Sequence, residues 1–185
     1  MPKSQEAMTK TLENKQKEEA PVAPPRERIL IAARDLFYQN GIRAVGVDAI
    51  AEAAATNKMT LYRHFGSKDD LIASYLSDLA AEGDALWVRL AEEHPGDPQA
   101  QIEGWLDHVE EVVSSRADRG CAIANAAVEL RDMDHPARQI IDDYKTRKRE
   151  RLVTLFTEAG YREPERLADE TFLLFEGARI SRQCL

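Results

Sequence analysis

The sequence predicts an all-α protein in which a small N-terminal unit of three helices precedes a larger helical bundle. From residue 26 onward, apolar residues recur almost everywhere at the three- and four-residue spacing of one helix face. Glycine and proline residues interrupt this spacing and mark the ends of the helices. No segment alternates apolar and polar residues over the length of a strand, so we expect no sheet.

The composition is that of a globular protein of one or two domains. Of the 185 residues, 43% are hydrophobic and 31% are charged, which excludes a disordered chain. No apolar run approaches the ~18–20 residues of a membrane span, and residues 1–25 lack the apolar segment of a secretory signal. With only Cys121 and Cys184 present, we expect no disulfide framework and a cytoplasmic location.

The net charge of −8 is distributed unevenly along the chain. Residues 1–25 carry no net charge, residues 26–70 carry +1 and residues 71–185 carry −9. A nucleic-acid partner is compatible with this balance only if the basic residues of the first part gather on one face. Residues 1–25 are interpreted as a solvated extension, with an arm that touches DNA through its lysines as the alternative.

Three short helices make up the predicted N-terminal unit. The first follows Pro24 and Pro25 and ends before Gly41. Its apolar face consists of Ile29, Ala32, Ala33, Leu36 and Phe37. The second helix covers residues 47–54, and the third covers residues 57–65, with Asn57 as its N-terminal cap.

The larger bundle begins with a long helix that follows Ser67. Asp70, three residues after Ser67, completes the capping-box pattern that opens this helix. Residues 94–98, with two prolines and a glycine, interrupt the helical pattern. Four more helices are expected, at about residues 102–113, 121–130, 137–159 and 167–180. The predicted divisions are an extension (1–25), a helix-turn-helix unit (26–70) and a helical bundle (71–185).

The helices at 47–54 and 57–65 form a candidate helix-turn-helix. The first helix and the turn after it contain small residues, Ala51 and Ala53 to Ala55, which allow the second helix to cross closely. The second helix displays the polar and basic side chains that a major groove requires. Periodicity alone fits an ordinary helical hairpin with a solvated polar face equally well.

Residues 50–68, together with residues 28–37 and Gly41, resemble the DNA-binding region of TetR-type (tetracycline-repressor-like) regulators. The run Leu61-Tyr62-x-His64-Phe65-x-Ser67-Lys68 is quite specific for that family. Weaker similarity to the ligand-binding half of one branch continues through residues 120–129, 135–137, 158–160 and 176–178. The resemblance implies a cytoplasmic homodimer that binds operator DNA, most often a repressor released by a small-molecule effector. Members of this branch commonly continue beyond the last of these segments, so we expect either a shortened final helix or a pocket that is partly open.

The expected DNA contacts lie in or beside the helix at 57–65. They are Gly46, Val47, Asn57, Lys58, Met59, Thr60, Tyr62, Arg63, His64 and Lys68. Lys58, Met59 and Arg63 are the candidates for reading base edges, and Tyr62, His64 and Lys68 for phosphate contacts. The chain departs from the family at Val45 and Gly46, where Ser or Thr is usual, and at Ala55, where Gly is usual. If position 55 has a positive φ, alanine there costs on the order of 1 kcal/mol.

Aromatic and polar residues of the C-terminal half are the candidates for an effector site. They are Trp87, Trp105, His108, Cys121, Asn125, Phe172 and Glu176, with Glu129 as a further polar anchor. Core packing remains the alternative for the aromatic residues, and a buried structural thiol for Cys121. The acidic excess favours a neutral or cationic effector. Dimer contacts are expected from the last two helices, through Ile140, Ile141, Leu152, Leu155, Phe156, Leu167, Phe172 and Leu174.

No other chemistry is indicated by the sequence. The four histidines and two cysteines lack the spacing of metal ligands, and no nucleophile elbow, phosphate-binding loop or dinucleotide fingerprint occurs. We therefore expect neither an enzyme nor a cofactor nor a metal. The basic run at 144–151 is interpreted as ion pairs to neighbouring helices, with a second nucleic-acid surface as the alternative. The competing function is an all-α small-molecule-binding or interaction module that does not bind DNA.

Overall fold

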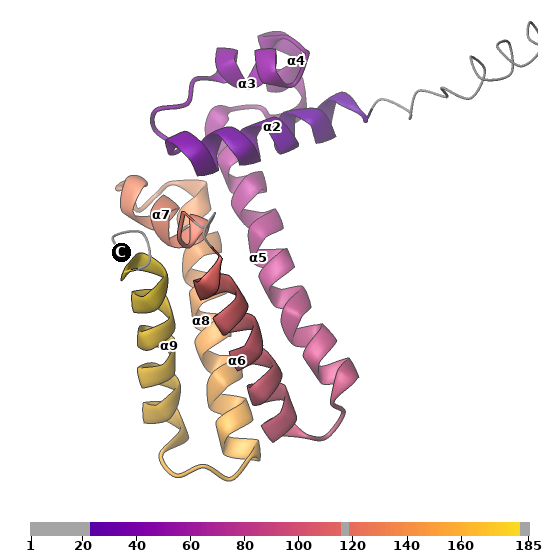
Figure 1. The fold of residues 1–185 in the computed structure, drawn as a ribbon. Helices are drawn as coiled ribbons and strands as arrows, with labels where there is room; N and C mark the ends of the chain where they lie inside the picture. Colours follow the sequence, from indigo (N-terminus) through magenta and orange to yellow (C-terminus); the bar gives the residue numbers. More distant parts are fainter. Residues whose placement is uncertain (1–22, 116–118, 182–185) are drawn as a thin grey trace, which may run out of the picture.

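The computed structural model describes residues 23–115 and 119–181, and its regular structure there is entirely helical (Figure 1). The helices are α2 (Pro25–Asn40), α3 (Val47–Ala53), α4 (Lys58–Phe65), α5 (Lys68–Glu93), α6 (Pro98–Ser114), α7 (Ala122–Glu129), α8 (Pro136–Glu158) and α9 (Pro164–Ser181). The predicted all-α class is confirmed. The expected extension lies almost wholly outside the described residues, as does Cys184. None of the described helices is long and apolar enough to cross a membrane.

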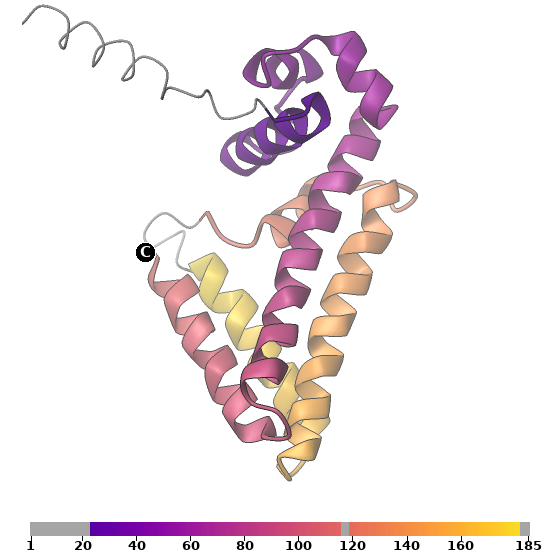
Figure 2. The same ribbon diagram turned by 90° about the vertical axis from the view of Figure 1, so that its right-hand side faces the viewer.

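Helix α5 connects the two parts of the molecule. Figure 1 shows α2 crossing α5 near the start of α5, with α3 and α4 above α2. The 26 residues of α5 extend about 39 Å, and Figure 2 shows that α5 continues from this upper unit to the far end of the bundle. There α5 packs against α6 and α8, which also contact α9, while α7 lies between the bundle and the upper unit.

The two predicted N-terminal caps, Asn57 and Ser67, are confirmed by hydrogen bonds. The Asn57 side chain accepts the N–H of Thr60 at 2.9 Å, and Ser67 Oγ accepts the N–H of Asp70 at 3.0 Å. These bonds satisfy backbone donors that the first turn of a helix leaves without partners. The expected start of the first helix was wrong by one residue, because Pro25 is already helical. Its fixed φ and missing N–H suit the first position of a helix.

Two groups of buried apolar side chains stabilise the fold. The first joins α2, α3, α4 and the start of α5 to α7 and the start of α8, and includes Ile29, Ile50, Leu61, Leu71 and Leu76. The second fills the far end of the bundle and includes Trp87, Trp105, Leu152, Leu155 and Phe175. The first core therefore crosses the expected boundary at residue 70, so the N-terminal unit is packed onto the C-terminal half.

Several apolar residues that we expected at a dimer interface lie inside the bundle instead. Ile141, Leu152, Leu155 and Phe156 are at most 5% exposed within their own chain. Helix α8 packs against α5, α6 and α9, and these neighbours bury most of its apolar face. Those residues cannot also contact a second copy, and the expectation was wrong for them.

Candidate functional site

Helix α4 presents one polar and basic face to the outside of the molecule. Leu61 and Phe65 anchor the helix in the first core, at 0% and 6% exposure. Met59, Tyr62 and Arg63 follow the i, i+3, i+4 spacing of a single face, and all three are exposed. Met59 is 84% exposed, so its side chain is accessible to a partner surface.

Hydrogen bonds from α2 fix the turn between α3 and α4. Ala55 has φ of +48°, a conformation that costs an L-residue on the order of 1 kcal/mol. The Arg28 guanidinium of α2 donates from Nε to the Ala54 carbonyl at 3.1 Å and from Nη2 to the Ala55 carbonyl at 3.3 Å. Sequence reasoning missed Arg28, because an arginine beside a predicted helix start gives no signal of a partner 26 residues away.

Some of the expected DNA-contacting residues already have partners within the protein. The Asn57 side-chain oxygen caps α4, and Lys58 Nζ lies 3.1 Å from Asp48 Oδ2. Gly46 precedes α3 without a side-chain cap, while Val47 and Thr60 are half-buried. His64 is exposed near the end of α4. The outer face of α4 is thus the most accessible part of the expected interface.

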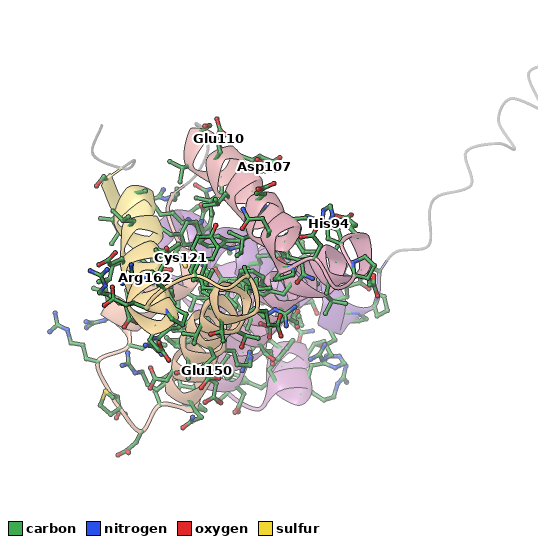
Figure 3. All side chains as sticks on the ribbon, turned by 90° about the horizontal axis from the view of Figure 1, so that it is seen from below. His94, Asp107, Glu110, Cys121, Glu150 and Arg162 are labelled. Carbon is green, nitrogen blue, oxygen red and sulfur yellow. The ribbon has the colours of Figure 1, made fainter. Side chains whose placement is uncertain are left out.

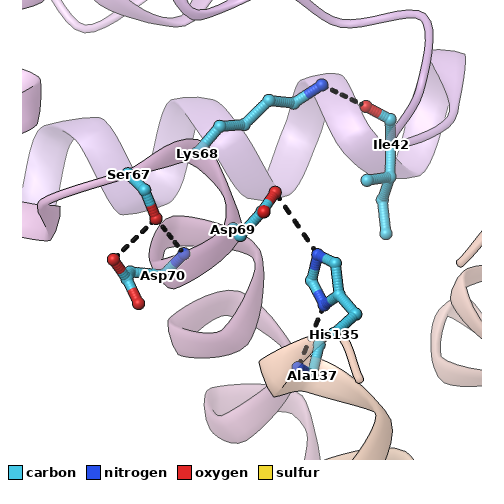
Figure 4. Close-up of polar contacts among 7 residues, drawn as sticks. All are labelled: Ile42, Ser67, Lys68, Asp69, Asp70, His135 and Ala137. Carbon is cyan, nitrogen blue, oxygen red and sulfur yellow. Dashed lines mark hydrogen bonds and ion pairs between the residues drawn. The ribbon is translucent and has the colours of Figure 1, made fainter. Parts of the chain in front are cut away.

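Lys68 makes an internal contact (Figure 4). Its Nζ donates to the Ile42 carbonyl at 2.7 Å and lies 5.9 Å from the centre of the Phe37 ring. Partial burial lowers the pKa of Lys68 below its usual value. The ammonium group has three donors, so a phosphate contact by Lys68 remains a prediction, but its role here is to fasten the loop between α2 and α3 to α5.

His135 and Glu129 connect the C-terminal half to the N-terminal unit. His135 Nδ1 accepts the N–H of Ala137 at 3.1 Å, so Nε2 carries the proton and faces Asp69 Oδ1 at 3.3 Å (Figure 4). Glu129 Oε2, at the end of α7, accepts the N–H of Arg43 at 2.9 Å. Glu129 was expected in the effector site but lies at this junction instead.

A cavity of about 610 Å³ lies between α5, α6, α8 and α9. Three of the expected effector residues, Trp87, Trp105 and His108, line it. The two indole rings are stacked with centroids 5.7 Å apart and planes 16° apart, and Phe175 meets Trp105 edge-on at 5.7 Å. Burial lowers the pKa of His108, so this side chain is neutral at neutral pH.

A second cavity of about 380 Å³ adjoins the first and reaches α2. The two share Leu79, Tyr144 and Arg179. Cys121 lines the second cavity, and its sulfur accepts from Lys145 Nζ at 3.7 Å. The wall on the side of α2 consists of Arg34, Asp35 and Tyr38.

The remaining expected effector residues lie beside these cavities. Glu176 is ion-paired with Lys145 Nζ at 2.6 Å, and the ring of Phe172 lies beneath the same ammonium group at 5.7 Å. The Asn125 amide donates to the Arg119 carbonyl at 3.1 Å and holds the segment before α7. None of the three lines either cavity.

Lys148 is a charged cavity residue that sequence reasoning missed. It was counted in the basic run at 144–151, whose expected ion pairs to neighbouring helices are confirmed at Lys145, Arg147 and Arg149. Lys148 instead points inward, and burial lowers its pKa to about 8. Tyr144 and Leu152 lie four residues to either side of it, and this spacing places Lys148 on the buried face.

The N-terminal unit and the whole fold match known regulators. Residues 29–75 match the model of the bacterial regulatory proteins of the tetR family. The transcriptional activator FasR of Mycolicibacterium smegmatis is 33% identical over 88 residues, 46% of this chain and 40% of that protein. The transcriptional repressor SCO4008 of Streptomyces coelicolor is 36% identical over 84 residues, 45% of this chain and 40% of that protein. The matched part of the chain thus spans well under half of these curated relatives.

Solved structures match over most of the chain. The TetR-family transcriptional regulator SCO4454 of Streptomyces coelicolor is similar with a TM-score of 0.81 and 28% identity, covering 87% of this chain and 85% of that one. A putative TetR-type regulator of Streptomyces avermitilis is similar with a TM-score of 0.73 and 29% identity, covering 88% and 87%. Residues 29–75 thus match the helix-turn-helix part of the tetR family, and the fold of the chain is that of TetR-family transcriptional regulators.

Proposed function

We propose that the chain is a homodimeric repressor that leaves its operator when a small molecule enters the cavity between α5, α6, α8 and α9. The observation that carries the proposal is the connection between the two sites. The cavity walls include Trp105 at one end and, through the adjoining cavity, Tyr38 of α2 at the other. A ligand that extends from the first cavity into the adjoining one would therefore contact α2, the helix that supports the helix-turn-helix.

DNA recognition is assigned to the outer face of α4. Arg63 is suited to guanine and Met59 to a thymine methyl group, while Tyr62 and His64 are placed for backbone contacts. Two copies of α4 enter successive major grooves about 34–36 Å apart. Arg28 supports this function indirectly, because it fixes the turn that sets the angle between α3 and α4.

The second copy is assigned to an exposed apolar stripe on α9. Leu173, Leu174 and Ile180 are 70%, 74% and 55% exposed. A Cβ atom added at Gly177, within this stripe, would meet nothing within 4 Å beyond its chain neighbours and the backbone of α9 itself, so a second helix has room to approach. The same stripe on two copies makes a self-complementary two-fold interface, which a palindromic operator requires.

Effector response is assigned to the contacts between the cavity and α2. Tyr38 Oη accepts the N–H of Arg119 at 2.6 Å, and Arg179 Nη2 donates to the Gly120 carbonyl at 2.9 Å. A ligand that moves Arg179 therefore shifts the segment to which Tyr38 is bound. Because such coupling is reciprocal, operator DNA weakens effector binding by the same factor.

A gel-shift with DNA from upstream of the protein's own gene tests this function. The wild-type chain is expected to bind, and Arg63→Ala is expected to lose about 1–3 kcal/mol of binding free energy for each half-site. Arg166→Ala, on the exposed surface of α9, is the matched control and should bind like the wild type. Absence of binding by the wild-type chain would favour the alternative, a module that does not bind DNA.

A further inference from the structure

The chain as a whole is acidic, with a net charge of −8, but the wall of the cavity is not. The cationic residues along its wall are Arg89, Lys148 and Arg179, and the acidic ones are Glu82 and Glu111. The carboxylate of Glu82 is held by the guanidinium of Arg34, with Nη2 at 2.7 Å from Oε2. The negative charge of Glu82 is thus partly neutralised by Arg34.

Lys148 is the most deeply buried of these cations. Its side chain is 8% exposed, and its Nζ lies 3.7 Å from the centre of the Phe175 ring. The nearest carboxylate oxygen in an ion pair with it is Glu176 Oε1 at 3.8 Å, beyond hydrogen-bonding distance. The other oxygen of Glu176 is bound to Lys145 at 2.6 Å. One carboxylate is therefore shared between the ammonium groups of buried Lys148 and half-buried Lys145.

This arrangement leaves positive charge in a place where water is scarce. A buried charge that is not fully paired is unfavourable, and an added anion offsets that cost. Arg179, which reaches the same region from α9, brings a third cation to the end where α8 and α9 meet. The electrostatics of this end favour a negative group.

Another part of the wall is apolar. Trp87 and Trp105 present their stacked rings there, and Leu79, Leu86 and Val112 extend the surface. At about 610 Å³ the cavity has the size of a small-molecule site. A molecule with one charged end and one apolar end matches both parts of the wall.

We propose that the effector is an organic carboxylate with an apolar body. Its carboxylate binds Lys148, and its body packs against Trp87 and Trp105. The proposal rests on the proposed function only in taking this cavity as the effector site. It replaces the expectation of a neutral or cationic effector, which the acidic excess of the chain had favoured.

The acidic excess fails as a guide because much of it lies on the surface. Asp107 and Glu110 are exposed on the outer side of α6 (Figure 3), and Glu150 is exposed on α8. Exposed charges are screened by salt over about 8–10 Å. The field inside the cavity is set by Lys148 and its immediate neighbours instead.

The test compares three ligands of one shape with the full chain and no DNA. They are adamantane-1-carboxylate, adamantane-1-carboxamide and 1-adamantylammonium. The chain has two tryptophans, and both line the cavity, so tryptophan emission reports binding directly. The carboxylate is expected to bind at least tenfold more tightly than the amide, and the ammonium compound more weakly than both.

Lys148→Met identifies the group responsible, and Arg149→Met is the matched control. Lys148→Met is expected to abolish the preference for the carboxylate over the amide. Arg149→Met removes a cation from the next position of α8, where it is paired with Asp169 on the surface, and is expected to leave the preference unchanged. Equal affinity for carboxylate and amide in the wild type, or an unchanged preference in Lys148→Met, would overturn the proposal.

The pH dependence of the wild-type chain gives a second readout that needs no variant. Because burial lowers the pKa of Lys148 to about 8, the affinity for the carboxylate is expected to fall about tenfold between pH 7 and pH 9, with no change for the amide. His108 is already neutral over this range, since its pKa is lowered. The groups that face Lys148 are Lys145, Tyr144, Glu176, Arg179, Cys121, His108 and Glu82. A carboxylate affinity independent of pH would contradict the assignment to Lys148.

Operator release is measured separately. Release of DNA by the carboxylate and not by the amide supports both proposals. Selective binding of the carboxylate without release supports the cavity chemistry and contradicts its role as effector site. A chain that binds no DNA but prefers the carboxylate contradicts the proposed function alone.

Discussion

At the scale of single residues, Ala55 and Lys148 occupy positions that are unfavourable for their residue types. Ala55 adopts a positive φ in the turn before the recognition helix, and Lys148 buries a charge beside the cavity. The sequence indicated the first, because the family resemblance marks that turn as a glycine position. It did not indicate the second, because burial of one lysine in a basic run depends on how neighbouring helices pack.

Replacing Ala55 by glycine should stabilise the protein. Ala55→Gly removes the strain of the positive φ, and the greater entropy of glycine in the unfolded chain offsets part of the gain. We expect the free energy of unfolding to rise by about 0.5–1 kcal/mol in urea denaturation. Ala53→Gly, within α3, is the control and should lower it by about 0.5–1 kcal/mol. A decrease for Ala55→Gly would show that the turn is not strained.

Replacing Lys148 by methionine should also stabilise the protein at neutral pH. The pKa of Lys148 is lowered to about 8 by burial, so below pH 8 the folded state carries a charge that it disfavours. Lys148→Met removes this cost, and Glu176 keeps Lys145 as its partner. We expect a gain of about 1–3 kcal/mol in the free energy of unfolding at pH 7. As pH rises from about 8 to 10.5 the wild type loses the proton and gains stability, so the difference should shrink. A difference that stays constant over this range would contradict the account.

At the scale of helices, local patterns predicted the elements well and their partners poorly. The capping residues Asn57 and Ser67 bond to backbone groups only three residues away. Both partners of each hydrogen bond are therefore visible in the local sequence. The periodicity of α8 marks a buried face but does not say what buries it. Its apolar residues Leu152 and Leu155 face their own bundle, whereas the exposed stripe lies on α9. The internal contact of Lys68 with Ile42 is likewise a tertiary contact that local spacing does not reveal.

A charge placed in the exposed apolar stripe of α9 should dissociate the dimer. Leu174→Glu places a charge in the centre of the proposed interface, where burial without a partner is unfavourable. Sedimentation at micromolar protein should then give a species near 20.8 kDa, against about twice that mass for the wild type. Leu106→Glu, at a 47% exposed position on α6, is the control and should leave the dimer intact. A wild-type chain of monomer mass, or a dimer that tolerates Leu174→Glu, would contradict this assignment.

At the scale of the whole molecule, the account depends on contacts that join the cavity to the helix-turn-helix. Tyr38 connects α2 to the segment before α7, and Glu129 connects α7 to the loop after α2. None of these contacts is local in sequence, so the family resemblance implied a ligand response without indicating its route. The fold class, the helix-turn-helix and part of the cavity were predictable, and the route between them was not.

Removing the Tyr38 hydroxyl should weaken the effect of the ligand on DNA binding. Tyr38→Phe keeps the ring but loses the 2.6 Å bond to Arg119. We expect operator affinity and ligand affinity to change little when each is measured alone. The factor by which ligand lowers operator affinity, typically 5- to 150-fold in such systems, should fall several-fold. Tyr161→Phe, which loses a similar bond to Gln99 at the far end of the bundle, is the control. Equal coupling in Tyr38→Phe and wild type would rule out this route.

The central claim is that two copies of the chain read DNA with the outer face of α4. Selection of binding sites by the full chain from random DNA duplexes tests it most directly. The account predicts a palindromic site with half-sites about 10 base pairs apart, or a multiple of that spacing, and Arg63→Ala should lose specificity at one base pair of each half-site. No enriched sequence, a single half-site without its inverted copy, or an unchanged site for Arg63→Ala would contradict it.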